Sequence, residues 1–258
     1  MNFRPFTAGD IPAAHALSQS VGWPHRLEDW SLMAGCGEGL ALGDLSACAL
    51  FWRMGEAAAS IGLVMVDPAR QGQGIGRRLM QAVLEPLAGC SVSLVSTRAG
   101  EPLYRSLGFE PSHRQRQHQG VALETAPLAA TCPGDLDSAL ALDMAAHGAG
   151  RAPVLRALWP VSQAVMLADG SGYALRRPFG KGEVIGPVIA PDLAGAQALI
   201  AALLRPGAYT RLDILADDAL SAWLTGLGLP MTSEPQAMRL GRALPRRGVF
   251  ALASQAFG

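Results

Sequence analysis

A glycine-rich segment that follows an apolar strand has the residue types needed to bind an anion. Residues 61–66 read as a buried strand, Pro68 breaks it, and Gly72, Gly74 and Gly76 lead into a helix. Such a turn points unpaired backbone N–H groups outward, and the dipole of the following helix favours negative charge. Glycine, which has no Cβ, lets a ligand approach closely. The segment therefore predicts a phosphate-binding loop.

Two common nucleotide-binding loops do not fit these residues. A dinucleotide loop needs Gly-x-Gly-x-x-Gly, but the count from Gly72 ends on Arg77 and the count from Gly74 ends on Leu79. A Walker loop needs Gly-Lys-Ser/Thr, and the only lysine of the chain, Lys181, is followed by glycine. Both nucleotide interpretations are therefore excluded.

A second motif, downstream, contains a tyrosine that could donate a proton. Residues 91–96 read as a strand and residues 101–109 as a short helix ended by Gly108. Tyr104 lies in this helix. A phenol of reference pKa about 10 can return a proton to a thiolate of pKa about 8.5. Taken alone, Tyr104 would be interpreted as a half-buried helix residue. Its place after the predicted phosphate loop favours a role as proton donor instead.

Together the two motifs resemble the GNAT superfamily of acetyl-CoA-dependent N-acetyltransferases. Gln71-x-x-Gly74-x-Gly76 is similar to its pyrophosphate loop, and Leu103-Tyr104-x-x-Leu107-Gly108-Phe109 is similar to its second signature, whose tyrosine protonates the leaving thiolate. The resemblance implies acetyl-CoA as co-substrate and Tyr104 as the catalytic acid. The residues that it implies for coenzyme binding are Val64, Met65 and Val66 on the strand, and Gln71, Gly72, Gln73, Gly74, Ile75, Gly76 and Arg77 in the loop.

The same resemblance places the segment between the first two helices over the acceptor. It implies that Trp23, His25 and Trp30 line the acceptor pocket, and residues 148–151 and 173–180 are further candidates for its wall.

The general base is left open by the sequence. Many family members carry a glutamate on the strand before the loop, but residues 61–66 contain no carboxylate. Deprotonation of the acceptor could go through water, Asp67, His25, Glu28 or Asp29.

Bulk composition limits the kinds of partner. Among the 258 residues, 21 basic residues balance 21 acidic ones, so there is no electrostatic argument for nucleic acid or an anionic membrane. The four cysteines form no Cys-x-x-Cys pair, which predicts neither a metal site nor a disulfide scaffold. The start of the chain lacks a signal-peptide apolar region. We expect a cytoplasmic protein with a small-molecule amine as acceptor, no membrane or nucleic-acid partner, and no metal; a homodimer is compatible with the sequence.

The expected elements follow the order of a GNAT domain. Strands are expected at 3–6, 40–45, 47–52, 59–66, 91–96 and 115–123, with helices at 10–21, 25–33, from 75 and at 101–109. A Pro- and Thr-containing linker at 125–135 predicts a boundary near residue 128.

The second half repeats the first but lacks the loop. Residues 185–192 parallel residues 61–68, yet the helical segment that follows has twelve residues (193–204) where the first copy has sixteen (69–84). Leu224 takes the place of Tyr104. We therefore predict an α+β protein of two tandem GNAT-like domains, each a mostly antiparallel twisted sheet flanked by helices. Residues 1–127 form the coenzyme-binding, catalytic domain and residues 128–258 a degenerate one.

The predicted activity is transfer of acetyl from acetyl-CoA to an amine by direct attack in a ternary complex. A non-catalytic acetyl-CoA-binding sensor or scaffold is the alternative from another class, favoured by the missing strand carboxylate. Acetylation of a protein lysine or N-terminus differs only in the acceptor.

Overall fold

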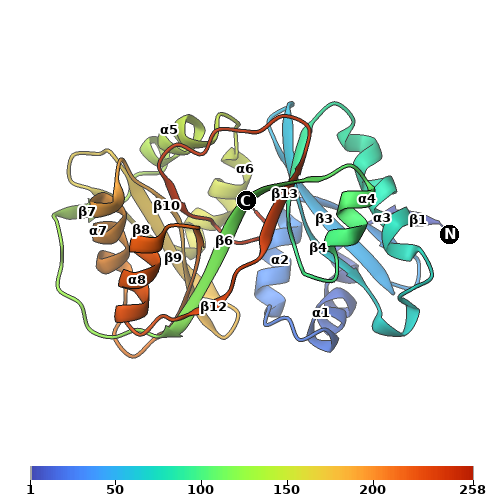
Figure 1. The fold of residues 1–258 in the computed structure, drawn as a ribbon, viewed down its shortest axis with the longest axis horizontal. Helices are drawn as coiled ribbons and strands as arrows, with labels where there is room; N and C mark the ends of the chain where they lie inside the picture. Colours follow the sequence, from blue (N-terminus) through green and yellow to red (C-terminus); the bar gives the residue numbers. More distant parts are fainter. Residues whose placement is uncertain (1, 258) are drawn as a thin grey trace.

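The computed structural model describes residues 2–257 and has two lobes, each a sheet flanked by helices (Figure 1). The first half contains β1 (Phe3–Pro5), η1 (Ala8–Asp10), α1 (Ile11–Ser20), α2 (Leu27–Gly35), β2 (Glu38–Leu42), β3 (Ala47–Met54), β4 (Ala58–Val66), η2 (Pro68–Arg70), α3 (Ile75–Leu84), η3 (Glu85–Leu87), β5 (Ser91–Ser96), α4 (Glu101–Ser106) and β6 (Glu110–Val121). The second half contains β7 (Thr131–Pro133), α5 (Leu136–His147), α6 (Ala152–Leu158), η4 (Trp159–Val161), β8 (Gln163–Leu167), β9 (Tyr173–Phe179), β10 (Gly182–Ile189), α7 (Leu193–Leu203), β11 (Tyr209–Leu215), α8 (Asp218–Gly226), β12 (Met231–Ser233), β13 (Gln236–Leu240) and β14 (Val249–Ala251). The predicted α+β class is confirmed.

The strands form one continuous sheet that runs through both lobes. Its order is β1-β2-β3-β4-β5-β13-β6-β11-β14-β10-β9-β8-β7, with β12 beside β6. Among the described strands, only β4–β5 and β10–β11 pair in parallel. These two pairs occupy equivalent places in the two halves, which matches the internal repeat of the sequence.

The halves exchange strands at the middle of the sheet. β13, from the second half, pairs with β5, Met238 opposite Leu94, and with the start of β6. Residues 115–121 of β6 instead pair with β11 of the second half. The expectation that 115–123 closes the first sheet is therefore wrong about its partner, because the pattern of one strand does not specify which distant strand will pair with it. The boundary near residue 128 stays a prediction, and neither half completes its sheet alone.

Buried side chains form three clusters. One lies between α3 and the first sheet, and another lies between α7 and the second sheet. The third joins the lobes and contains Trp30 and Trp52 from the first half together with Leu155, Tyr173 and Phe257 from the second half. Because this cluster draws on both halves, the lobes share a core.

We expect Met238→Ala to destabilise the protein, although this residue stands more than 170 positions after β4 in the chain. Met238 is 0% exposed and belongs to the core of the first lobe. Loss of its side chain should lower the free energy of unfolding by about 2–5 kcal/mol, from lost burial and the cavity left behind. Urea unfolding measures this. Met231→Ala is the matched control, since Met231 is 48% exposed and should change stability little; equal effects of the two substitutions would contradict the strand exchange.

Candidate active site

Strands β4 and β5 separate halfway along and leave a wedge between them. Their parallel ladder ends at the pair Ile61–Leu94, whereas β4 stays paired with β3 as far as Val66. The β3–β4 register shifts between Gly62 and Met65, and Leu63 has a φ of 52°. Positive φ is uncommon for a residue with a side chain, and bulges of this kind bend a strand. The bulge at Leu63 therefore accounts for the divergence of β4 from β5.

The backbone of β4 beyond the bulge presents hydrogen-bonding groups to this wedge. Asp67 donates its backbone N–H to the carbonyl of Ser46, just before β3, at 2.8 Å. Since alternate residues of a strand direct their N–H groups to opposite sides, the N–H groups of Val64 and Val66 point away from β3 and into the wedge. By the same alternation, the backbone N–H of Met65 points toward β3.

The predicted phosphate loop stands at the open end of β4. Gly72 and Gly74 have φ of 76° and 73°, and a Cβ on either would meet open space. The backbone N–H groups of residues 72–77 donate no hydrogen bond to any described residue. A run of free N–H groups ahead of the α3 N-terminus is an anion-binding arrangement.

Side chains tie this loop to its neighbours. Gln71 donates from Nε2 to the carbonyl of Val66 at 3.2 Å, and Arg77 donates from Nη2 to Ser106 Oγ of α4 at 2.8 Å. Arg70 pairs with Asp44. The end of β4, the loop and α4 are thus brought together, as the two sequence motifs require.

Tyr104 lies on α4 in the same core cluster as Ile61 and Leu94. It is 7% exposed, and its hydroxyl makes no hydrogen bond to the part of the chain that the structure describes. Burial raises the pKa of Tyr104 to about 12. The phenol therefore keeps its proton throughout the neutral range.

In the second half, the chain itself occupies the positions equivalent to the anion-binding loop and the wedge. The N-terminus of α7 is capped by Asp192, whose Oδ1 accepts from the backbone N–H of Gly195 at 2.8 Å. The parallel ladder of β10 and β11 also stops early, but β14 enters the gap and pairs with both strands, Ala251 opposite Val188 and Ile214. A carboxylate stands where the first half has its anion loop, and a strand occupies the wedge.

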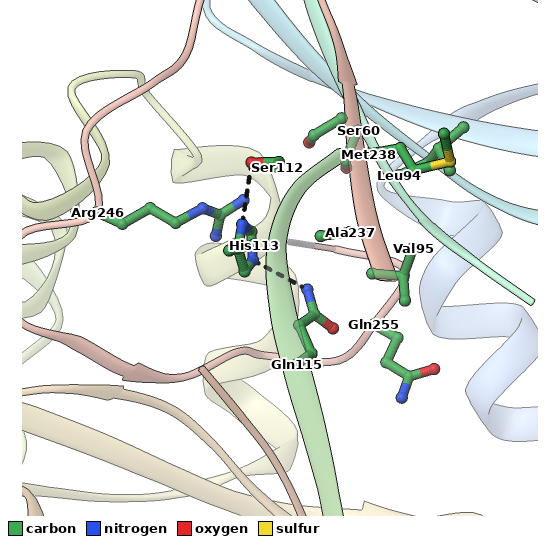
Figure 2. A pocket seen from close by; sticks show the side chains of 11 residues that line it. Ser60, Leu94, Val95, Ser112, His113, Gln115, Ala237, Met238, Arg246 and Gln255 are labelled. Carbon is green, nitrogen blue, oxygen red and sulfur yellow. Dashed lines mark hydrogen bonds between the residues drawn. The ribbon is translucent and has the colours of Figure 1, made fainter. Parts of the chain in front are cut away.

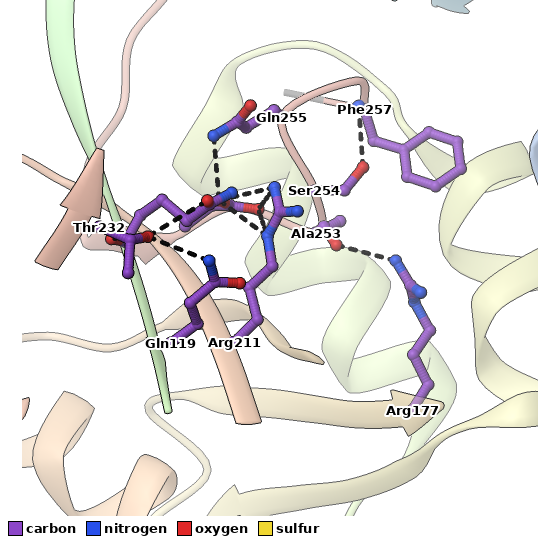
Figure 3. A network of polar contacts seen from close by, with 10 residues as sticks. Gln119, Arg177, Arg211, Thr232, Ala253, Ser254, Gln255 and Phe257 are labelled. Carbon is purple, nitrogen blue, oxygen red and sulfur yellow. Dashed lines mark hydrogen bonds and ion pairs between the residues drawn. The ribbon is translucent and has the colours of Figure 1, made fainter. Parts of the chain in front are cut away.

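The segment after β14 returns to the first lobe and packs on one face of β4. Figure 3 shows its residues Ala253, Ser254, Gln255 and Phe257. Arg177 of β9 donates from Nη2 to the carbonyl of Ala253 at 3.0 Å. Ser60 donates from Oγ to the carbonyl of Phe257 at 3.5 Å. A Cβ on Gly62 would come within 2.7 Å of the Ala256 Cβ. Residues 252–257 therefore pack directly on β4 next to its bulge.

A small pocket opens between the lobes on this same face (Figure 2). Ile61 and Leu94 pack toward α3, so their neighbours Ser60, Ser93 and Val95 point to the opposite face, where they line the pocket. Its other walls come from Ser112, His113 and Gln115 of β6, Ala237 of β13, Arg246 of the loop before β14, and Gln255. The pocket thus meets the apex of the wedge from the side opposite α3.

None of the three residues predicted to line the acceptor pocket is in the lining of the interlobe pocket. Trp30 is 0% exposed and donates from Nε1 to Ser18 Oγ at 3.2 Å, so the expectation that it contacts the acceptor is wrong: it is a core residue. Trp23 packs edge-on to His25, which packs edge-on to Phe179 of β9. Trp23 and His25 thus lie where the lobes meet, outside the lining of the pocket described here.

The predicted wall segments of the second half take different places. Arg151 forms a buried ion pair with Asp143 at 2.6 Å, and Tyr173 donates from its hydroxyl to the same carboxylate at 2.8 Å. These residues hold the second lobe together. Arg177 and Phe179, by contrast, lie against the returning segment and His25.

The candidate general bases differ in how many hydrogen bonds their side chains already accept. Asp29 accepts from the backbone N–H groups of Arg26 and Gly180, both at 2.9 Å, and from the Arg26 guanidinium. Burial raises the pKa of Asp29, but these contacts outweigh it and leave the pKa below its usual value. Such a carboxylate is a structural link between the lobes. Asp67 accepts from the N–H of Ala69, and Glu28 is exposed.

Burial, with the nearby positive charge of Arg211, lowers the pKa of His25 to about 4. Its ring is therefore neutral near pH 7, and its buried Nδ1 has no hydrogen-bond partner among residues 2–257.

Two further properties of residues 2–257 concern metal binding and membrane insertion. They contain no group of three or more His, Cys, Asp or Glu side chains arranged to hold a metal ion. None of their helices has the length and apolar character to span a bilayer.

Comparison with known proteins agrees with this geometry. Residues 36–111 and residues 139–249 each match a family model described as an acetyltransferase (GNAT) domain. A curated relative of Bacillus subtilis, named uncharacterized N-acetyltransferase YitH, is 29% identical over 233 residues, which cover 84% of this chain and 82% of that protein.

Solved structures share the fold at low identity. A putative acetyltransferase from Pyrococcus horikoshii superposes with a TM-score of 0.85 at 18% identity, covering 100% of this chain and 95% of that one. A GCN5-related N-acetyltransferase from Sphaerobacter thermophilus gives a TM-score of 0.62 at 16% identity, covering 96% and 97%. The two-lobed arrangement therefore recurs in other proteins.

We expect Gly74→Val to weaken acetyl-CoA binding by tenfold or more. The new side chain would stand in the open space in front of the free N–H groups and would strain a left-handed residue by roughly 1–2 kcal/mol. Gly207→Val is the matched control, because Gly207 has a φ of 80° and equally open surroundings but lies in the second half. Titration calorimetry measures both; a similar loss of affinity in the two variants would argue against the loop as the coenzyme site.

Proposed function

This chain is a tandem GNAT acetyltransferase, and from that premise we propose that its first half binds acetyl-CoA and transfers the acetyl group to a small-molecule amine by direct attack. The second half, in this proposal, binds no coenzyme and closes the acceptor side of the site. Two family-model matches and the curated relative support the N-acetyltransferase activity.

The observation that carries the proposal is the contrast between the two wedges. In the first half the wedge beside β4 is open, and free N–H groups of residues 72–77 stand at its mouth. In the second half β14 fills the wedge, and Asp192 caps α7. The protein's own β14 supports the idea that such a wedge accepts an extended chain. By analogy, we assign Val64 and Val66 to the pantetheine arm and residues 71–77 to the pyrophosphate.

The chemical step needs an amine on one face and a thioester on the other. The acceptor nitrogen would attack the carbonyl carbon from the side of the interlobe pocket, with the N–H of Val64, at the thioester end of the pantetheine arm and next to the bulge, as donor to the oxygen that becomes negatively charged. As the carbon–sulfur bond breaks, Tyr104 would pass its proton to the sulfur, while the nitrogen loses a proton to water. This scheme involves no covalent enzyme intermediate.

A non-catalytic coenzyme sensor makes a different prediction for the same wedge. It is favoured by the absence of a carboxylate on β4 and by the structural use of Asp29. Incubation of the protein with acetyl-CoA and a panel of small amines separates the two: coenzyme binding without any transfer would support the sensor. Transfer only to a lysine or N-terminus of a polypeptide would replace the small-molecule acceptor.

We expect Tyr104→Phe to lower kcat by about a hundredfold or more and to leave the Kd for acetyl-CoA nearly unchanged, because general acids contribute mainly to the transition state. Since the pKa of Tyr104 lies near 12, its acid form should persist up to about pH 11, so kcat of the unmodified protein should not fall between pH 7 and pH 10 through loss of this proton.

Tyr209→Phe, on β11, is the matched control and should keep full turnover. Steady-state kinetics and calorimetry check both variants. Unchanged turnover in Tyr104→Phe would remove this residue as the acid.

A further inference from the structure

The interlobe pocket contains two buried polar atoms of opposite character, and neither has a partner. Nη1 of Arg246 is a donor, and Oε1 of Gln115 is an acceptor. Both side chains line the pocket (Figure 2). Gln115 is 1% exposed. Since buried polar groups in folded proteins are nearly always hydrogen-bonded, two complementary unpaired atoms in one pocket indicate a ligand with an anionic acceptor group and an N–H donor.

Arg246 carries the charge of this pocket. It forms no ion pair or hydrogen bond with the described residues, and it is the only lining side chain that is charged at neutral pH. Burial, together with the positive charge of Arg151, lowers the pKa of Arg246 to about 10. Arg246 is half-buried, with its Nη1 closed off from solvent, so its charge without a nearby carboxylate is costly and a bound anion would offset that cost.

The side chains that line the pocket beside Arg246 are neutral and hydrogen-bonded to one another, and the carboxylate of Asp213 already has a partner. His113 contacts Ser112 Oγ through Nδ1 at 3.1 Å and Gln115 Nε2 through its own Nε2 at 3.4 Å. Burial and Arg246 lower the pKa of His113 to about 4, so the ring adds no charge near pH 7. Asp213, which accepts from Gln255 at 3.2 Å, is already paired with Arg211.

One uncompensated positive charge matches one carboxylate better than a doubly charged phosphate. The same charge repels a second ammonium group, which disfavours polyamines. The pocket also lies at the right place for an acceptor, because Ser60 on its wall stands three residues before the bulge of β4, about 10 Å along the strand.

We infer that the acceptor is a small amine that carries a carboxylate, with the carboxylate bound by Arg246 and an N–H of the acceptor received by Gln115. This inference rests on the proposed function and adds the chemical class of the acceptor. Arg246 is then the residue that determines specificity.

The test uses pairs of acceptors that differ only in carboxylate against carboxamide: glycine, β-alanine, γ-aminobutyrate, glutamate and phenylalanine with their amides. For the pair that the protein prefers, kcat/KM should be about tenfold or more higher for the carboxylate, as expected for a charge-assisted hydrogen bond. In Arg246→Met the preference should vanish, through a rise in KM for the carboxylate that exceeds any change for the carboxamide. Arg247→Met, an exposed neighbour on the same loop, should keep the preference.

Gln115→Leu gives an independent reading should Arg246→Met fold poorly. It should lower kcat/KM for both members of a pair equally and retain the carboxylate preference. Calorimetric binding of acetyl-CoA checks that each variant is folded. Equal use of carboxylate and carboxamide by the unmodified protein, or a preference that survives Arg246→Met, would overturn the inference while leaving the acetyltransferase proposal intact. Absence of transfer to every amine would overturn both.

Discussion

The separation of β4 from β5 beyond Ile61 and Leu94 is the constraint on which the rest of the site depends. A strand edge inside a protein exposes N–H and C=O groups that must find partners. The second half meets this requirement with its own β14, which pairs with both β10 and β11. The first half leaves the edge of residues 62–66 free and places a loop of unpaired N–H groups at its mouth. We interpret this difference as the structural basis for one coenzyme site per chain.

The strand exchange gives the second half a structural role that does not depend on a loop of its own. β13 closes the first sheet beside β5, and residues 252–257 continue from β14 onto the face of β4 that carries Ser60 and Gly62. The link between Asp29 and the backbone of Gly180 fixes the lobes on the other side of the interface. A pocket walled by β4, β6 and the loop of Arg246 needs both halves. In this view the second half shapes the acceptor side.

Much of the coenzyme side follows from local sequence, and most of the acceptor side does not. The glycines at 72 and 74, the helix from Ile75 and the strand at Ser91–Ser96 are encoded by nearby residues, and the structure has them at or close to the expected bounds.

The left-handed Leu63 could not be expected, since leucine rarely adopts positive φ. Pairing of β13 and β14 depends on contacts far apart in sequence. The family resemblance implies that Trp30 lines the acceptor pocket, but helix α2 directs this side chain into the core. His113, Gln115 and Arg246 stand in no recognisable motif, and only the fold brings them together.

The central claim is that acetyl-CoA occupies the wedge of the first half and no equivalent place in the second. Hydrogen–deuterium exchange of the full chain, with and without saturating acetyl-CoA, tests it most directly. The account predicts that the coenzyme slows exchange at the backbone amides of residues 64–66 and 72–77 and leaves residues 184–196 unchanged. Slower exchange at β10 and the start of α7, or none at the loop of the first half, would contradict it.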